Sequence, residues 1–193
     1  MIKNKTIVIF ASGNGTNAEN IIRFFHAGNA VKVAAVFTDN SCAFVLERAK
    51  LLDVNAYPFK MNELKNPEGV LKKILTLQTD LIVLAGFLRL MPDFITQKFK
   101  NKIINIHPAL LPKYGGKGMY GHHVHEAVYQ AAEHETGITV HYVNENYDEG
   151  EIILQQKVAL NPDDTPQTIA RKISELEMTY FPLAIEKVLL LNS

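Results

Sequence analysis

The chain has 193 residues, of which 47% are hydrophobic and 21% are charged, a composition typical of a soluble globular protein. Twenty basic and twenty acidic residues give a formal net charge of zero. Nucleic-acid-binding proteins usually carry a basic excess, so we expect no nucleic-acid partner. The single cysteine, Cys42, excludes an internal disulfide and a cysteine-based zinc site, and it is typical of a reducing compartment.

Lysines precede a short apolar run, Ile7–Ala11, as they do in a signal peptide. This run is shorter than the hydrophobic part of a usual signal peptide, and Gly13 follows it closely, so a buried strand explains it better. The most apolar later run, "LIVLAGFLRLM", is interrupted by Arg89 and is too short to span a membrane. We therefore expect a cytoplasmic protein with no membrane partner.

The first half of the chain alternates apolar, β-branched runs with segments of helical periodicity. This alternation is typical of βαβ units, in which helices cover both faces of a parallel sheet. Leu81–Ala85 is apolar at every position, as expected for a strand that is buried on both sides. The expected strands are 6–11, 31–38, 54–59 and 80–86, and the expected helices are 18–26, 42–52 and 64–77.

The second half begins with a short expected helix, 93–100, and a strand, 102–107, which Pro108 ends. A loop rich in glycine and proline and a helix, 124–133, come next. Two alternating runs, 137–143 and 151–160, flank a polar turn and predict antiparallel strands. A final helix starts with Pro166 as its first residue and Thr165 as its N-cap.

No repeat, low-complexity tract or linker interrupts the chain, so residues 1–193 are expected to form one domain. The predicted fold is α/β, a Rossmann-like open sheet. Its N-terminal half is parallel, its C-terminal half contains antiparallel strands, and helices cover both faces.

A glycine turn follows the first expected strand. Gly13, Gly15 and Ala18 match the spacing of a dinucleotide-binding turn, and Asp39 lies where such a site needs an acidic residue. Asn14, Thr16 and Asn17 are more polar than a dinucleotide requires and could instead donate hydrogen bonds to one phosphate. A tight strand-to-helix turn without any ligand is the third reading, and this stretch alone leaves all three open.

Two polar residues, Asn105 and His107, end the strand before Pro108. Residues two apart on a strand point the same way, so the pair is expected to face one site at the carboxyl edge of the sheet. An amide beside an imidazole can polarise a carbonyl and stabilise an oxyanion. Asp148, in the later turn, could orient His107 and raise the pKa of its imidazole, or could simply complete a turn beside Gly150.

Three other histidines, His122, His123 and His125, cluster in one short segment. Their spacing is not that of a zinc-binding helix, and no cysteine is available to complete a site. We therefore expect no metal, and a solvated or loop-anchoring role for these side chains.

Five segments together resemble one family: "SGNGTN", "LAGFLRLM", "NIHPALLPKYGG", "YDEGEIILQ" and "ELEMTYFP". They are similar to the phosphoribosylglycinamide formyltransferase family of folate-dependent formyltransferases. The resemblance implies transfer of a formyl group from 10-formyltetrahydrofolate, a cosubstrate, to the primary amine of glycinamide ribonucleotide. This reaction belongs to de novo purine (IMP) biosynthesis, needs no metal, and is carried out by a monomer or a homodimer.

The resemblance also implies roles for residues at matching positions. Residues 1–100 would form the phosphate-binding half, and residues 101–193 the catalytic and folate-binding half. The implied catalytic residues are Asn105, His107 and Asp148; the implied ligands of the substrate phosphate are Gly15, Thr16 and Asn17; the implied ribose contact is Glu177; and the implied folate-binding segment is Leu88, Arg89, Leu90 and Met91.

The sequence departs from the family in the loop "GGKGMYGHHVHEAV" and in ending soon after its last helix. The nearest alternative is a 10-formyltetrahydrofolate hydrolase, which usually carries an additional N-terminal domain for which no room is expected here. Methionyl-tRNA formyltransferase would need a further C-terminal domain and a basic surface. The remaining alternatives are an NAD(P)-dependent oxidoreductase and a non-catalytic phosphate-binding module.

Overall fold

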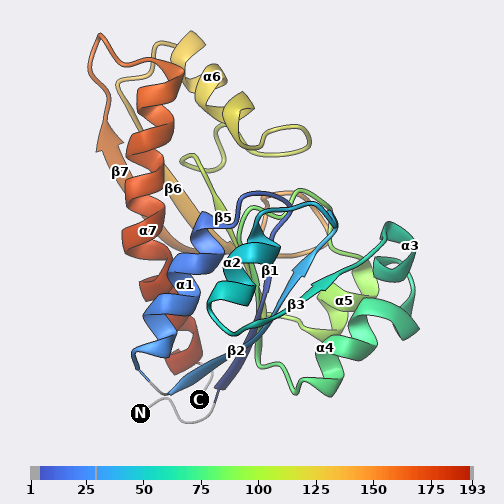
Figure 1. The fold of residues 1–193 in the computed structure, drawn as a ribbon. Helices are drawn as coiled ribbons and strands as arrows, with labels where there is room; N and C mark the ends of the chain where they lie inside the picture. The colour runs from blue at the N-terminus through green and yellow to red at the C-terminus, as the bar shows by residue number, and fades with distance from the viewer. Residues whose placement is uncertain (1–4, 29, 192–193) are drawn as a thin grey trace.

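A computed structural model describes residues 5–28 and 30–191 of the chain. Its centre is a seven-stranded sheet with the strand order β3-β2-β1-β4-β5-β6-β7 (Figure 1). The strands are β1 (Lys5–Phe10), β2 (Val31–Thr38), β3 (Asn55–Pro58), β4 (Leu81–Leu84), β5 (Ile103–His107), β6 (Glu135–Tyr142) and β7 (Ile152–Ala159).

Strands β1 to β5 are parallel, whereas β6 pairs antiparallel with both β5 and β7. The chain builds the sheet outward from β1 in one direction to β3 and then in the other direction from β4 onward. In open sheets of this kind, a crevice forms beyond the carboxyl ends of the strands near this reversal. The predicted fold class, including the change from parallel to antiparallel pairing, is confirmed.

Helices lie on both faces of the sheet. They are α1 (Thr16–His26), α2 (Val45–Leu51), α3 (Met61–Leu64), the π-helical turn η1 (Pro67–Leu71), α4 (Lys72–Thr76), α5 (Asp93–Lys98), α6 (His122–Gln130) and α7 (Pro166–Leu191).

The strand β1 alternates between two hydrophobic cores. Ile7 and Ile9 pack with the apolar sides of α1, α2, α6 and α7, whereas Val8 and Phe10 pack with those of α3, α4 and α5. All four of these strand residues are fully buried. Helices α1 and α7 lie side by side along one face (Figure 1), and this packing brings the C-terminal helix close to the glycine turn at the start of α1.

One predicted helix is interrupted. The segment 64–77 divides into the end of α3, the turn η1 and α4, because Pro67 starts a new turn and Gly69 adopts a non-helical backbone conformation (φ −92°, ψ −114°). The predicted cap of α7 is confirmed, since the backbone N–H of Thr168 donates to the Thr165 hydroxyl at 3.3 Å. Among the described residues, no helix is both long and apolar enough to cross a membrane.

Candidate active site

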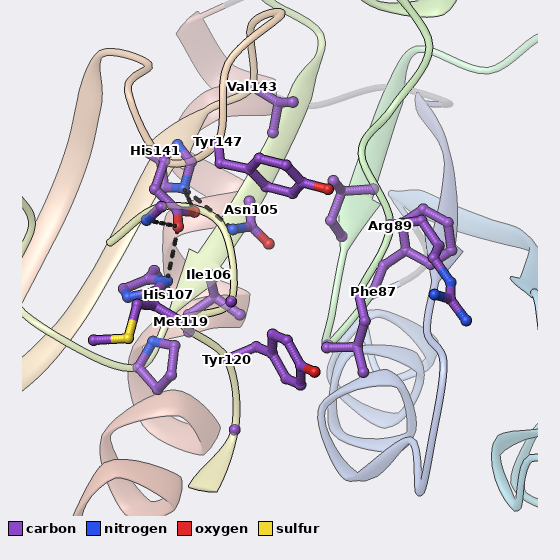
Figure 2. A pocket seen from close by; sticks show the side chains of 18 of the residues that line it. Phe87, Arg89, Asn105, Ile106, His107, Met119, Tyr120, His141, Val143 and Tyr147 are labelled. Carbon is purple, nitrogen blue, oxygen red and sulfur yellow. Dashed lines mark hydrogen bonds and ion pairs between the residues drawn. The ribbon is translucent and has the colours of Figure 1, made fainter. Parts of the chain in front are cut away.

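A cavity of about 520 Å³ opens beyond the carboxyl ends of β4 and β5 (Figure 2). Its walls come from the loops that follow these strands, the turn between β6 and β7, and one side of α7. Residues from across the sequence therefore meet in one place. Of the residues singled out in the sequence, those that line the cavity are Asn17, Leu88, Arg89, Leu90, Met91, Asn105, His107, His125, Asp148 and Glu177.

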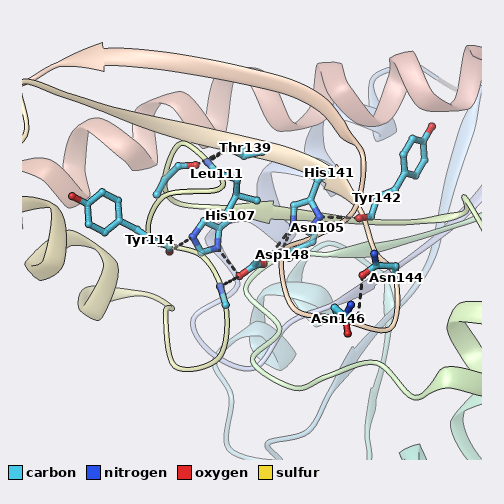
Figure 3. A network of polar contacts seen from close by, with 12 residues as sticks. Asn105, His107, Leu111, Tyr114, Thr139, His141, Tyr142, Asn144, Asn146 and Asp148 are labelled. Atoms are coloured by element: carbon cyan, nitrogen blue, oxygen red, sulfur yellow. Dashed lines mark hydrogen bonds and ion pairs between the residues drawn. The ribbon is translucent and has the colours of Figure 1, made fainter.

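His107, the last residue of β5, is held on both sides of its ring. Its Nε2 lies 2.7 Å from the backbone carbonyl oxygen of Tyr114, and its Nδ1 lies 3.5 Å from Asp148 Oδ2 (Figure 3). A carbonyl oxygen can only accept a hydrogen bond, so Nε2 carries a proton and donates it. Nδ1, beside the carboxylate, is the nitrogen that remains available to exchange a proton.

Burial lowers the pKa of His107, and the neighbouring His141 lowers it further. The charge of Asp148 and the hydrogen bond to Tyr114 act in the opposite direction without reversing the shift. Asp148 therefore raises the pKa of the imidazole as the sequence suggested, but the net shift is downward, because His107 is only 3% exposed.

Asp148 lies in the turn after β6, with a left-handed backbone conformation (φ 57°). One carboxylate oxygen accepts the backbone N–H of Gly116 at 2.9 Å, and the other lies 3.5 Å from Nε2 of His141. Burial raises the pKa of Asp148, but His141, His107 and the Gly116 amide together outweigh burial and hold the pKa below its usual value. The carboxylate is therefore ionised between two imidazoles (Figure 3).

Asn105 faces His141 across the antiparallel β5–β6 pair. The Nδ1 of His141 donates to the Tyr142 carbonyl oxygen at 2.8 Å, and its Nε2 lies 3.2 Å from the Asn105 amide nitrogen. This contact fixes the orientation of the Asn105 amide. Its second N–H and its carbonyl oxygen are left available to the cavity.

At the α7 side of the cavity, the Asn17 amide donates to Glu177 at 2.8 Å. Burial raises the pKa of Glu177, and the bond from Asn17 only partly opposes this shift. The two residues are 160 positions apart in the sequence, and they meet because α1 and α7 pack together.

The glycine turn ends in Gly15, which precedes α1 with a left-handed backbone (φ 75°). No side chain caps this helix, so the N–H groups of its first turn, including those of Thr16 and Asn17, are available to an anion. Of the three residues predicted to bind a phosphate, only Asn17 lines the cavity, whereas Gly15 and Thr16 lie outside its lining.

We expect Gly15→Ala to lower the free energy of unfolding by about 1–3 kcal/mol or more, the usual cost of a strained backbone. A Cβ at this position would lie 2.3 Å from Cγ2 of Val45 and 2.9 Å from its Cα, and an alanine would have to keep the positive φ. Urea denaturation measures the change. Gly13→Ala is the matched control, since no atom lies within 4 Å of its added Cβ, and equal losses in both variants would contradict this account.

Asp39 is not placed to accept a hydrogen bond from the ribose of a dinucleotide, as an NAD site would require. Its carboxylate accepts from the Arg89 guanidinium at 2.6 Å, and its side chain is only 3% exposed. Because so little of this side chain is exposed, a ribose hydroxyl could not reach the carboxylate without displacing the residues that cover it. Together with the antiparallel second half of the sheet, this pairing argues against the NAD(P)-dependent alternative.

The segment from Leu88 to Met91 forms one wall of the cavity. Ser12, just beyond β1, accepts the Leu88 N–H at 3.1 Å, and Arg89 is tied to Asp39. Met91 is buried in the core, whereas Leu88 and Leu90 are exposed at 45% and 39%. The Arg89 side chain points away from Asn105 and His107 (Figure 2).

The three clustered histidines are not equivalent. His125 is buried and lines the cavity, and its Nδ1 has no hydrogen-bond partner. His122 and His123 lie outside the lining, with ring centroids 3.9 Å apart. Across residues 5–28 and 30–191, no group of three or more His, Cys, Asp or Glu side chains is arranged to hold a metal ion.

Sequence reasoning missed His141, Tyr120 and Tyr147, which all line the cavity. His141 lies outside the histidine cluster and belongs to no motif in the sequence. Its position on a strand pairing with the Asn105 strand is the signal that could have identified it. The two tyrosines lie in loops, where residue type alone does not predict orientation.

Comparisons with known proteins show which family this chain resembles. The sequence model of the formyl transferase family matches residues 5–185. Phosphoribosylglycinamide formyltransferase from Haemophilus influenzae is 37% identical over 94% of this chain and 86% of its own length. The protein of the same name from Bacillus subtilis is 35% identical over 98% of this chain and 97% of its own length.

A solved structure agrees as well. The crystal structure of phosphoribosylglycinamide formyltransferase from Bacillus halodurans superposes with a TM-score of 0.87 at 35% identity, and the match covers 96% of this chain and 95% of the other. The similarity therefore covers nearly the whole length of both chains. The chain belongs to the phosphoribosylglycinamide formyltransferase family.

Proposed function

We propose that this protein transfers the formyl group of 10-formyltetrahydrofolate to the primary amine of glycinamide ribonucleotide, a step in de novo purine biosynthesis. One observation carries the proposal: Asn105, His107 and Asp148 converge on a single cavity that also reaches Asn17 and Glu177. The names of the relatives support the choice of ribonucleotide.

The ribonucleotide would enter at the α1 side. The free N–H groups at the start of α1 and the positive end of its dipole suit a phosphate monoester, with Gly15, Thr16 and Asn17 as its ligands. Glu177 of α7 accepts a hydrogen bond from Asn17 of α1. In this position Glu177 could also accept hydrogen bonds from the ribose hydroxyls. With its phosphate bound at α1, the substrate would extend across the cavity so that its amine points toward His107.

The folate would lie in the cavity against the wall formed by Leu88, Arg89, Leu90 and Met91. A cavity of about 520 Å³ is in the usual range for a small-molecule site. Backbone groups of this wall could bind the polar edge of the pteridine, and the exposed leucines could cover its apolar faces. The anchoring of the segment by Ser12 and Asp39 would keep it preorganised.

The chain's residues supply what formyl transfer needs. As the amine nitrogen bonds to the formyl carbon, negative charge develops on the formyl oxygen. The Asn105 amide and a protonated Nδ1 of His107 would donate to that oxygen. Asp148 would stabilise the imidazolium as it forms and help to relay the proton of the amine, through water, to N10 of the folate. The bond between N10 and the formyl carbon then breaks, so that tetrahydrofolate leaves and the formyl group stays on the amine.

In this proposal residues 1–100 provide the phosphate site and residues 101–193 the catalytic groups. The folate would lie between them, because the proposed Leu88–Met91 wall belongs to the first part and the loops after β5 and β6 belong to the second. We also propose that the protein is cytoplasmic and assembles as a monomer or a homodimer.

The test follows loss of the formyl group from 10-formyltetrahydrofolate with and without glycinamide ribonucleotide. We expect turnover only when the ribonucleotide is present, together with formylated ribonucleotide as product. Equal turnover without it would show a hydrolase instead. Absence of turnover, combined with tight NADH binding, would favour the oxidoreductase.

A further inference from the structure

The loop that follows β5 carries the group that fixes His107. The chain leaves β5 at His107, turns through Pro108 and returns at Tyr114, whose carbonyl oxygen accepts from Nε2 of His107 at 2.7 Å. Tyr114 has a left-handed backbone (φ 57°). The position of this carbonyl therefore depends on what holds the loop.

Two side chains on the neighbouring strands hold the first part of the loop. Thr139 of β6 donates from its hydroxyl to the Ala109 carbonyl at 2.7 Å and accepts the Leu111 N–H at 3.0 Å. Gln155 of β7, which pairs with Thr139 in the sheet register, donates from Nε2 to the Leu111 carbonyl at 2.9 Å and to the Thr139 hydroxyl at 3.0 Å.

These four bonds use every hydrogen that the two side-chain groups can donate. The Gln155 Nε2 has two hydrogens and two acceptors, and the Thr139 hydroxyl donates once and accepts twice. The network sets the orientation of the Gln155 amide, and a side chain without an N–H donor could not replace it. Figure 3 shows the Leu111–Thr139 contact next to the His107–Tyr114 contact.

Packing supports the loop only partly on the side away from the substrate cavity. A second cavity, of about 270 Å³, lies there between the loop and the outer strands, with Leu111, Pro112 and Gln155 in its walls. Farther along the loop, the Tyr114 hydroxyl and the Lys113 ammonium donate to Glu133 at 2.9 Å and 2.7 Å, and the Gly116 N–H donates to Asp148 at 2.9 Å. Loss of the Gln155 bonds would leave the Leu111 carbonyl unpaired beside a space into which the loop can move.

We propose that Gln155 is a positioning residue for His107. Gln155 does not line the substrate cavity. Through Leu111 and Thr139 it holds the loop so that the Tyr114 carbonyl fixes the proton on Nε2, which keeps Nδ1 facing Asp148 and available to exchange a proton. The effect on turnover rests on the proposed function, whereas the effect on the His107 tautomer does not.

Gln155→Met tests the proposal, because methionine keeps the length of the side chain and removes both donors. We expect kcat for formyl transfer to fall about tenfold or more, since small misplacements of catalytic groups are costly. The KM values for both substrates should change less than about twofold, since no cavity wall is altered. Imidazole ¹⁵N NMR of the free protein should show His107 losing its preference for a protonated Nε2.

Gln156→Met is the matched control. Gln156 is the adjacent residue of β7, and its side chain points to the opposite face of the sheet. We expect it to leave kcat and the His107 spectrum unchanged. A Gln155→Met protein with wild-type kcat, or with reduced kcat but an unchanged His107 tautomer, would overturn the proposal.

A second pair of variants applies if Gln155→Met fails to fold. Thr139→Ser keeps the hydroxyl and should retain the wild-type tautomer, whereas Thr139→Val removes it and should shift the tautomer as Gln155→Met does. Equal spectra in these two variants would overturn the proposal. If the wild type lacks transferase activity but the tautomer responds as expected, the proposed function fails and the positioning role stands.

Discussion

Replacement of His107 by alanine is expected to lower kcat for formyl transfer by about 10²–10³-fold, the usual cost of removing one oxyanion donor. The imidazole lies between the Tyr114 carbonyl and Asp148. Its removal would eliminate the protonated donor and leave the Asp148 carboxylate with one imidazole neighbour, His141. Steady-state kinetics with both substrates measure the loss.

The control for this variant is His134→Ala, since His134 is exposed and lies outside the cavity. It should retain wild-type kcat. Circular dichroism should show that His107→Ala folds, and added imidazole should restore part of the lost turnover. A folded His107→Ala protein with near-normal kcat would remove His107 from the catalytic role.

Replacement of Asp148 by asparagine is expected to lower kcat by about 10²–10⁴-fold, the range attributed to positioned acid–base groups. The carboxylate raises the pKa of His107 against the lowering effect of burial. Without that charge the imidazolium is less stable, so the pKa of His107 should fall further below its usual value. NMR titration of the His107 ring should show its midpoint at lower pH in the variant.

Asp163→Asn is the matched control, because Asp163 is exposed and lies outside the cavity. Its kcat and the His107 titration should match those of the wild type. A lower kcat in Asp148→Asn without any shift of the His107 midpoint would show that Asp148 acts otherwise than through the imidazole. A normal kcat would remove it from the proposed mechanism.

Local sequence patterns predicted most of the elements correctly. The continuous apolar runs became β1, β2 and β4 because a strand covered on both faces has no polar side. The helix expected over 64–77 was interrupted, since helical periodicity continued through Pro67 and Gly69 although their backbone requirements do not fit a regular helix. Asp39 matched the dinucleotide spacing, yet an arginine fifty positions later holds it.

The sequence by itself determined the α/β class, the glycine turn before α1, and the placement of Asn105 and His107 at one strand end, since all three depend on neighbouring residues. Only the tertiary structure decided which distant residues meet. The β5–β6 pairing placed His141 against Asn105, the turn after β6 delivered Asp148 to His107, and packing of α7 on α1 joined Glu177 to Asn17. Burial is likewise a property of the whole fold, and for this reason the pKa of His107 is lowered despite its carboxylate neighbour.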